Sequence, residues 1–480
     1  MVWSTSGCED AHEQREAGAP ELPVRVAFDD GRLEDLYRHR TDMGNATWFA
    51  SVMAGEVLYD HTRQSFLIWN GKRWERDRTG RVVELAKRAL RHAQELVRYH
   101  PSTPVYNAMT KHLLASESLK RIQAMLELSK PAMYALTEHF DRDPWLLNVE
   151  NGAIDLRTGE LRPHHRHDLC SRVAPVMFAP DASAPRWERF LREVFAEDTD
   201  LIDFIQRLVG YTLTGLTSEQ CLMLLYGTGA NGKSTFINAL RNVFGDYAMH
   251  AAMSTFLTKK TDGPGNEIAA LVGARLVTAV EADDGRRLSE ALVKQLTGGD
   301  AVTARFLFQE FFTFVPTFKL WLAVNYLPPV RGSDNAIWRR IRVIPFSRTF
   351  SEADQDRELA ARLREESAGI LMWAVSGCLA WQSVGLGSPA AVVASTDAYR
   401  SEMDVVGAFM RERCQICAGA TIAKAALYDA FVCWCSTSNE QPLSKKDFGA
   451  RVARLGFMED RTKSARSWRG IIVHNIADDG

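Results

Sequence analysis

The sequence has no long apolar run, no cysteine framework and almost no net charge. Its longest apolar stretches, near 222–226 and 320–324, have the length of buried strands, whereas a membrane-spanning helix needs roughly 20 residues. Eight cysteines are scattered along the chain without the spacing of a disulfide-rich secreted domain, and no signal-peptide pattern precedes them. These absences indicate a protein of the reducing cytoplasm that has no membrane partner.

The net charge of −2 counts against a protein that passively coats nucleic acid. It does not exclude an enzyme whose basic groups gather in one channel or on one domain. Apolar residues make up 46% and charged residues 25% of the chain, which is ordinary globular composition. A length of 480 residues favours about three domains.

Composition and periodicity divide the chain into segments of different character. We predict an α/β fold overall, because helical and strand-like stretches alternate through the middle of the chain. The segments are a disordered polar arm at 1–27, an α+β region at 28–186, an α/β core with a helical lid at 187–384, a Gly- and Pro-containing linker at 385–398, and a small helical domain ending in a strand pair at 399–480.

The N-terminal α+β region carries its own local signals. Asn70-Gly71 lies between two short apolar runs and predicts a hairpin, because this pair tolerates the positive φ angles of a tight turn. Helices are expected over 82–99 and 105–128, and a second group of strands over 145–161.

A glycine-rich loop follows the apolar run 222–226 and precedes a helical segment. This order of strand, loop and helix is the one that P-loop nucleotide chemistry requires. Backbone amides and the positive end of the helix dipole would hold the phosphates of ATP, and the Lys-Ser pair would serve phosphate and Mg²⁺. The expected nucleotide contacts are Gly227, Thr228, Gly229, Ala230, Asn231, Gly232, Lys233, Ser234 and Thr235.

A P-loop also needs an acidic partner strand. The apolar run 274–281 ends in Glu281, which we expect to hold Mg²⁺ with Ser234 or to polarise the attacking water. Asp283 is the reserve candidate for the metal. A solvated acidic turn after a strand is the alternative.

Two further polar positions follow or precede apolar strands. Asn325 ends the run 318–325 and is a candidate for contacting the γ-phosphate, although a strand-ending Asn is also a common turn former. Arg339 and Arg340 precede another apolar run. Such arginines can complete the ATP site of a neighbouring subunit, and a surface ion pair is the alternative.

The same stretches, in the same order, resemble the helicase part of the phage and plasmid primase–helicases, members of helicase superfamily three related to the poxviral primase–helicase. The resemblance begins near residue 30. It covers 41–45, 69–77 and 148–161 in the N-terminal region, then 227–235, 275–281, 292–305, 316–325 and 338–346 in the core, and 431–435, 446–449 and 468–471 near the C-terminus.

The resemblance implies an AAA+ core, an N-terminal helicase-associated region and a C-terminal winged helix. It further implies a homo-oligomeric, hexameric ring that hydrolyses ATP between subunits and draws single-stranded DNA through a channel. By position, Lys233 and Ser234 match the phosphate and magnesium residues and Glu281 the acidic residue. Asn325 matches the sensor, and Arg340, with Arg339 beside it, matches the arginine acting in trans.

DNA contacts are expected in two places. The segment 294–314 matches the family's channel hairpin, and we assign Lys294, Arg305 and Phe306 to DNA, although Arg305 could instead brace the ATP site. The last domain has a local basic bias that is typical of a DNA-binding surface, and an exposed charged face is the alternative. Its assigned residues are Lys445, Lys446, Arg466 and Arg469.

Cysteine pairs in the last domain admit a zinc interpretation, which we do not favour. Cys433 and Cys435 lie on a predicted helix, where residues two apart do not share a face. The N-terminal region also has no zinc-binding cysteine quartet, and we therefore expect no primer synthesis, with a separate primase as a candidate partner.

The function predicted from these features is an ATP-dependent DNA helicase that acts on single-stranded or forked DNA during replication of a phage, plasmid or integrated mobile element. One alternative is a replication initiator that melts an origin without processive unwinding. Others are a small-molecule P-loop kinase and a host-defence ATPase.

Overall fold

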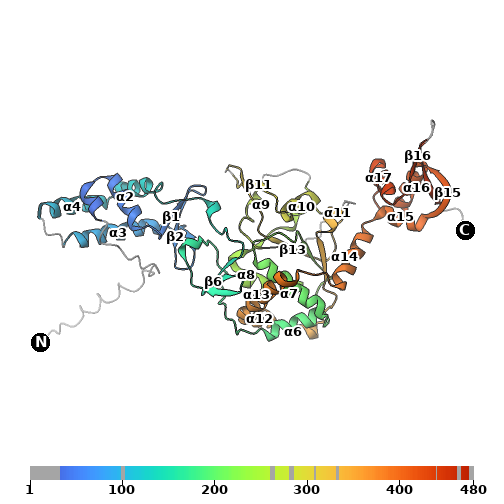
Figure 1. Cartoon of the computed structure of the whole chain (residues 1–480), viewed down its shortest axis with the longest axis horizontal. Helices are drawn as coiled ribbons and strands as arrows, with labels where there is room; N and C mark the ends of the chain where they lie inside the picture. Colours follow the sequence, from blue (N-terminus) through green and yellow to red (C-terminus); the bar gives the residue numbers. More distant parts are fainter. Residues whose placement is uncertain are drawn as a thin grey trace, which may run out of the picture. The chain divides into compact units, whose positions relative to one another are not determined.

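The computed structural model describes residues 33–98, 103–259, 265–280, 286–307, 310–330, 335–438, 440–461 and 466–474 (Figure 1). The chain forms two compact units. The first comprises 1–154 and 161–173, and the second comprises 155–160 and 174–480. The predicted arm at 1–27 lies outside the described residues.

The first unit packs a helical layer beside a small sheet of order β3-β2-β1-β4. The helices are α1 (Glu34–Arg38), α2 (Asp42–Val52), α3 (Arg81–Val97), α4 (Thr103–Ser116) and α5 (Leu119–Ser129), and the strands are β1 (Val57–Asp60), β2 (Ser65–Trp69), β3 (Trp74–Arg76) and β4 (Tyr134–Ala135). The hairpin predicted at Asn70-Gly71 is confirmed, with Gly71 at φ +94°.

The prediction of a single helix over 105–128 is wrong, because two helices, α4 and α5, occupy that range. Ser118 adopts an extended conformation (φ −64°, ψ 143°) before α5 and ends the helical path. The strands expected over 145–161 are confirmed as a separate sheet of order β5-β6-β7. They are β5 (Leu146–Val149), β6 (Gly152–Asp155) and β7 (Glu160–Arg162).

The second unit is built on a parallel sheet of order β14-β8-β13-β10-β9, which confirms the predicted α/β character. Its strands are β8 (Leu222–Tyr226), β9 (Ala248–His250), β10 (Leu276–Val280), β13 (Lys319–Val324) and β14 (Ile341–Pro345). β8, β10, β13 and β14 are buried on both faces along most of their length, which explains why they read as continuous apolar runs rather than alternating ones.

Alternate residues of each strand enter different layers. Leu222 and Leu224 join a core that includes residues of α9 and α10, whereas Trp321 faces the helices of the other layer. The Trp321 ring lies 5.8 Å from Phe236 of α8, and its indole N–H donates to Thr212 of α7 at 3.2 Å. The flanking helices (Figure 1) are α6 (Pro185–Val194), α7 (Thr199–Leu213), α8 (Lys233–Phe244), α9 (Asn266–Ala269), α10 (Glu290–Thr297), α11 (Asn335–Trp338), α12 (Leu359–Glu365) and α13 (Ser367–Val384).

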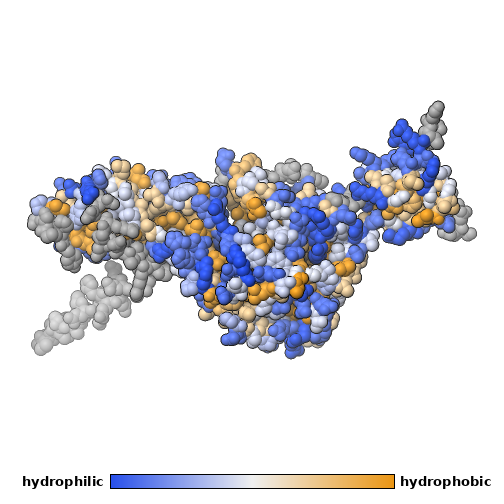
Figure 2. All heavy atoms as spheres, viewed as in Figure 1, coloured by the Kyte–Doolittle hydropathy of each residue, from blue (hydrophilic) through white to orange (hydrophobic). Residues whose placement is uncertain are grey.

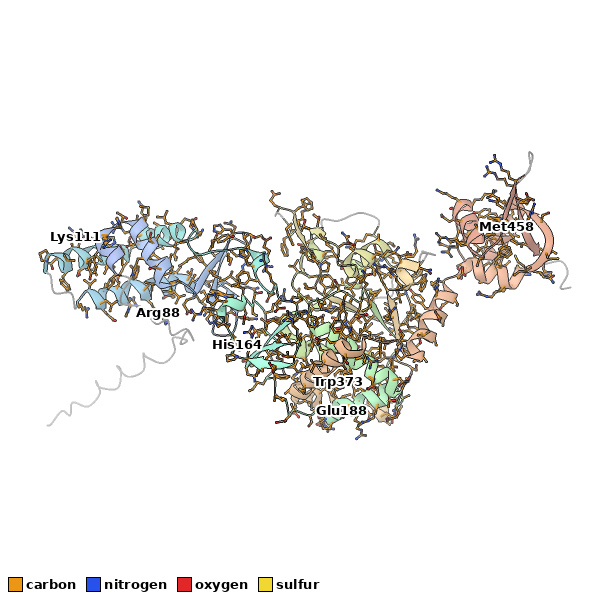
Figure 3. The ribbon with its side chains drawn as sticks, viewed as in Figure 1. Arg88, Lys111, His164, Glu188, Trp373 and Met458 are labelled. Carbon is orange, nitrogen blue, oxygen red and sulfur yellow. The ribbon has the colours of Figure 1, made fainter. Side chains whose placement is uncertain are left out.

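Helices α7 and α13 approach each other through glycines. A Cβ added to Gly210 would lie 2.0 Å from the Cys378 nitrogen, and one added to Gly377 would lie 2.1 Å from the Gln206 oxygen. Among the described helices, α13 is long and apolar enough to cross a membrane by length and composition. Its close packing on α7 identifies it as a core helix. Figure 3 labels Trp373 of α13 and Glu188 of α6 in this helical layer.

The predicted linker at 385–398 is wrong from residue 390 onward, where helix α14 (Ala390–Glu402) begins. Pro389 precedes the helix as its cap, and Val392 and Tyr399 are buried. The Thr396 hydroxyl oxygen also accepts a hydrogen bond from the Val343 N–H of β14 at 3.1 Å. The helix therefore covers the edge of the sheet instead of bridging two domains as an open chain.

The C-terminal part of the second unit runs helix, strand, helix, helix, strand, strand. Its elements are α15 (Val405–Arg413), β15 (Cys414–Ala423), α16 (Lys424–Thr437), α17 (Lys445–Arg454), β16 (Glu459–Arg461) and β17 (Arg466–Val473). The predicted closing strand pair is confirmed as β16 and β17, whereas β15 was not predicted. Cys433 is exposed and Cys435 is buried, as expected for residues two apart on a helix.

We predict that Gly210→Ala lowers the thermal unfolding midpoint, although Ala is a better helix former than Gly by about 1 kcal/mol. The added methyl group must push α13 away from α7, and overpacking of this kind costs about 1–3 kcal/mol. The matched control is Gly449→Ala in α17, where the added Cβ would have its nearest neighbour at 3.9 Å. An unchanged midpoint for Gly210→Ala in calorimetry would contradict the close crossing.

Candidate functional site

The carboxyl ends of the parallel strands meet at one edge of the sheet. Tyr226 of β8 pairs in register with Val324 of β13, so the residues that follow, Gly227 and Asn325, begin their loops side by side. β13 and β14 flank β8 on its two sides. The next strand in the chain, β9, lies at the far lateral edge of the sheet, beyond β13 and β10. Such a reversal of strand order creates a crevice at the carboxyl ends, where ligands of α/β proteins bind.

The glycine-rich loop bends sharply between β8 and α8. Gly229 (φ +109°) and Gly232 (φ +87°) adopt left-handed conformations that favour glycine. A Cβ on Gly227 would lie 2.5 Å from the Phe346 carbonyl oxygen, so the loop lies directly against the chain that follows β14. A hydrogen bond of 2.8 Å from the Phe350 N–H to the Ala230 carbonyl fixes the far side of the loop.

Lys233, the first residue of α8, is buried, with 6% of its surface exposed. Its ammonium donates to the Gly227 carbonyl, to the Asn231 side-chain oxygen at 3.1 Å and to the Asn325 side-chain oxygen at 3.2 Å. These acceptors are neutral. A buried ammonium at the first residue of a helix, where the dipole is also positive, favours an anionic ligand.

The Asn231 side chain takes part in the site, a contribution that the motif alone did not indicate. Its side-chain oxygen accepts from Lys233, and its side-chain nitrogen is buried without a hydrogen-bond partner. A buried unsatisfied donor is unfavourable, and a phosphate oxygen would satisfy it. Thr228, Ala230 and Ser234 are exposed, so the rim of the loop is open. These residues fit a bound polyphosphate.

The magnesium candidates are only partly described. Ser234 lies in the first turn of α8 with its side chain exposed. Glu281 and Asp283 lie outside the described residues. β10 ends at Val280, which pairs with Ala323 of β13. Within the described ranges, no group of three or more His, Cys, Asp or Glu residues could hold a metal.

Arg339 and Arg340 lie at the amino ends of the parallel strands, opposite to the carboxyl ends where the glycine-rich loop begins. Ile341, the next residue, pairs with Leu222 at the start of β8, and the five-residue strand separates these arginines from the glycine-rich loop by roughly 16 Å. Arg340 is 7% exposed, and its guanidinium donates to the Ala336 carbonyl at 2.6 Å. Arg339 is exposed and donates to the Gln220 side chain at 3.4 Å.

Arg340 and Arg339 differ in burial. The resemblance placed Arg340 first as the residue that reaches a neighbour, but its side chain is enclosed within its own subunit. Arg339 has the exposure that contact with another chain requires. The alternation of exposure between adjacent residues could not be read from the sequence, because it depends on the short helix α11 that precedes them.

The hairpin predicted near 302–315 is confirmed as strands β11 (Val302–Ala304) and β12 (Phe312–Phe314). The Arg305 guanidinium lies 4.8 Å from the centre of the Phe311 ring, which is exposed. Phe306 stacks on Phe312 at 5.6 Å and packs against the core. Lys294 lies on α10 with a partly exposed side chain. Arg305 therefore remains available at the surface, whereas Phe306 is largely used in packing.

The basic residues assigned to the C-terminal domain lie on its surface. Lys445 and Lys446 are exposed in the first turn of α17, and Lys445 also lies 5.5 Å from the centre of the Tyr428 ring. Arg466 is exposed on β17, whereas Arg469 forms an ion pair of 2.7 Å with Asp460. Hydrophilic side chains cover the part of this domain that carries α17 and β16 (Figure 2).

Comparison with known families gives matches along most of the chain. Residues 46–196 match a family described as D5 N terminal like. Residues 225–340 match a family of unknown function, and residues 401–472 match a family described as Poxvirus D5 protein-like.

The curated relatives come from large DNA viruses. A putative helicase of Acanthamoeba polyphaga mimivirus is 28% identical over 57% of this chain and 31% of its own length. A putative helicase of Frog virus 3 is 25% identical over 69% of this chain and 43% of its own length. A putative primase of African swine fever virus is 23% identical over 62% of this chain and 33% of its own length. The chain thus spans less than half the length of these relatives.

Among solved structures, the apo A form of the NrS-1 C-terminal region resembles this chain with a TM-score of 0.51. The identity is 11%, and the alignment covers 89% of this chain and 98% of the other, so this likeness concerns the fold alone. The viral relatives and the flanking D5-type matches agree with the resemblance carried by the motifs. The D5-type matches and the viral relatives together support a phage and viral primase–helicase family for this chain.

Proposed function

We propose that this chain is an ATP-driven DNA helicase that acts in replication of a phage, plasmid or integrated mobile element. The observation that carries the proposal is the buried Lys233 ammonium, which joins the glycine-rich loop to Asn325 at the carboxyl edge of a parallel sheet. Family membership adds a helicase-type role in replication to this nucleotide chemistry. ATP is the proposed substrate.

Each residue of the site has a proposed part in ATP hydrolysis. Lys233 neutralises charge on the β- and γ-phosphates, and backbone amides of the loop donate to their oxygens. When ATP binds, the Asn325 side chain gives up its hydrogen bond to Lys233 and contacts the γ-phosphate or the attacking water instead. Ser234, with Glu281 or Asp283, would hold Mg²⁺, whose chemistry is to neutralise charge on the transferring phosphoryl group.

The position of Arg339 supports hydrolysis between subunits. Arg339 lies at the amino ends of the strands, whereas the glycine-rich loop of its own chain lies at the carboxyl ends. Only Arg339 of another copy could therefore reach the triphosphate. A head-to-tail contact of this kind, repeated with rotation, closes into a ring. We propose a hexamer, in which Arg339 of one protomer stabilises charge in the site of the next.

The connection between the ATP site and DNA is proposed to run through β13. The hairpin β11–β12 is followed after a short connection by β13, which is buried along its length and is followed by Asn325. A buried strand in a packed core moves as a unit, so a shift of Asn325 would be transmitted to the hairpin. Arg305, beside the exposed Phe311, is the proposed contact to single-stranded DNA.

The element order of the C-terminal domain supports a winged helix. In such domains the last helix and the following strand pair contact DNA. Lys445 and Lys446 on α17, with Arg466 and Arg469 on β17, are the proposed phosphate contacts.

Lys233→Ala should lower the ATPase rate at least about 100-fold, because the transferring phosphate loses its cationic partner. The matched control is Lys111→Ala, an exposed lysine of the first unit, which should keep the wild-type rate. Circular dichroism should show the same helical content in both variants. A Lys233→Ala chain that still hydrolyses ATP would refute the site.

Arg339→Ala should also lower the ATPase rate, by about 10³-fold or more, because an arginine finger stabilises charge in the transition state. When Lys233→Ala and Arg339→Ala chains are mixed, activity should partly return, because some interfaces then pair an intact loop with an intact Arg339. Arg340→Ala should instead lower stability, since its buried side chain donates to the Ala336 carbonyl. Failure of the mixture to recover activity would contradict action in trans.

Single-stranded DNA should stimulate the ATPase rate, and forked DNA should be unwound in the presence of ATP. An origin-melting initiator would lack strand displacement on forks, and a small-molecule kinase would lack DNA stimulation. Steady-state hydrolysis with and without oligonucleotide, together with a strand-displacement assay, decides between these three functions.

A further inference from the structure

The loop that enters β8 lies next to Arg339 because of the register of the sheet. β14 and β8 pair in parallel, with Ile341 opposite Leu222. Two residues earlier in each segment, Arg339 lies beside Gln220. The Leu222 N–H donates to the Arg340 carbonyl at 2.8 Å, which fixes the two segments against each other at this point. The pairing of the two strands therefore holds Gln220 beside the exposed arginine.

The Gln220 side chain joins two segments through the two ends of its amide. Its oxygen accepts a hydrogen bond from the Arg339 guanidinium at 3.4 Å, and its nitrogen donates to the Gly298 carbonyl at 3.3 Å. Because an amide has an acceptor end and a donor end, the contact with Gly298 turns the oxygen toward Arg339. A carboxylate could not donate to Gly298, and an alkyl side chain could make neither contact. Glutamine is thus suited to both contacts.

The backbone around Gln220 is held by the core, so its side chain starts from a fixed position. The Gln220 N–H donates to the Thr217 carbonyl at 3.0 Å. The Glu219 N–H donates to the buried Tyr211 hydroxyl at 3.2 Å, and the Glu219 carboxylate accepts from the Trp381 indole N–H at 2.8 Å. Gln220 itself has a φ of +48°, a left-handed conformation that residues other than Gly and Asn seldom adopt. Such a conformation persists where the surrounding structure fixes it.

The contact with Gln220 steers the Arg339 guanidinium and leaves it able to bind phosphate. At 3.4 Å the contact is longer than a typical N–H···O hydrogen bond. A guanidinium carries several N–H donors, so donation to one amide leaves others for phosphate oxygens. Long side chains lose rotamer freedom when they are ordered at an interface. A side chain that is already oriented has less freedom to lose when a neighbouring protomer docks.

The geometry points to Gln220 as a positioning residue for Arg339. By holding the guanidinium in one direction before the subunits meet, Gln220 raises the fraction of interfaces in which Arg339 reaches the γ-phosphate of the next protomer. The rate of hydrolysis depends on this placement, because catalysis needs each group in its productive geometry. Binding of ATP by the glycine-rich loop does not depend on it. The inference rests on the proposed function, in which Arg339 completes the neighbouring ATP site.

The test measures steady-state ATP hydrolysis by wild type and Gln220→Asn over a series of ATP concentrations. Asparagine tolerates the left-handed conformation but is shorter by a methylene group, so the contacts with Arg339 and Gly298 are lost while the loop keeps its path. Gln220→Gly, which accepts the same φ without a side chain, is the second variant. The matched control is Gln123→Asn, at an exposed glutamine of α5 in the first unit. The thermal unfolding midpoint of each variant reports whether the fold is kept.

Both Gln220 variants should lower kcat by about tenfold or more, since a small misplacement of a catalytic group has effects of this size. The KM for ATP should stay unchanged, because the glycine-rich loop is intact. Gln123→Asn should keep both constants. A wild-type kcat in the Gln220 variants would overturn the inference. A fall in kcat accompanied by a matching rise in KM would overturn it too, because that result assigns the defect to the glycine-rich loop.

Two further arms separate positioning from a general structural role. Because Gln220 acts through Arg339, the double variant Gln220→Asn/Arg339→Ala should hydrolyse ATP at the rate of Arg339→Ala alone. Mixing Gln220→Asn chains with Lys233→Ala chains should raise the rate per Gln220→Asn chain, since its intact loop then meets a correctly held Arg339. A further loss in the double variant, or no recovery in the mixture, would overturn the inference.

Failure of the proposed function gives a different result. If Arg339→Ala hydrolyses ATP at the wild-type rate, Arg339 does not act in a neighbouring site, and the proposed trans-acting site and this inference fall together. If Arg339→Ala is inactive and the Gln220 variants are fully active, only the role of Gln220 is overturned.

Discussion

The candidate nucleotide site depends on the contact between Lys233 and Asn325 across the carboxyl ends of two parallel strands. The pairing of Tyr226 with Val324 sets this contact, because it starts both loops at the same level of the sheet. A shift of one residue in that pairing would turn Asn325 to the other face of the strand. The buried ammonium, the amide oxygen and the left-handed glycines thus form a site only in this register.

The same parallel arrangement places the arginines away from that site. A residue before β14 must lie at the amino edge of the sheet, because β14 runs parallel to β8. An arginine at that position lies away from the glycine-rich loop of its own chain, which is why the proposed role of Arg339 requires a neighbouring chain. Arg340 is buried, and its guanidinium donates to the Ala336 carbonyl of α11. Arg339 is exposed at the surface.

Much of the core was predictable because its strands are continuous apolar runs bounded by glycine or polar residues. The order of strand, loop and helix around Lys233, the hairpin at Asn70-Gly71 and the closing strand pair all follow from local chemistry. Three features depend on long-range contacts and were missed: the role of the Asn231 side chain, the burial of Arg340, and α14 in place of a linker. Helix α14 is stabilised largely by packing on β14, which a sequence window cannot reveal.

The most direct measurement is a structure of the chain bound to a non-hydrolysable ATP analogue and Mg²⁺. We predict phosphate oxygens within hydrogen-bonding distance of the backbone amides of 229–234, with the Lys233 ammonium bound to the phosphates instead of to Asn325. We also predict a guanidinium from the adjoining protomer at the γ-phosphate. A nucleotide bound elsewhere, with the Lys233–Asn325 contact intact, would contradict these predictions.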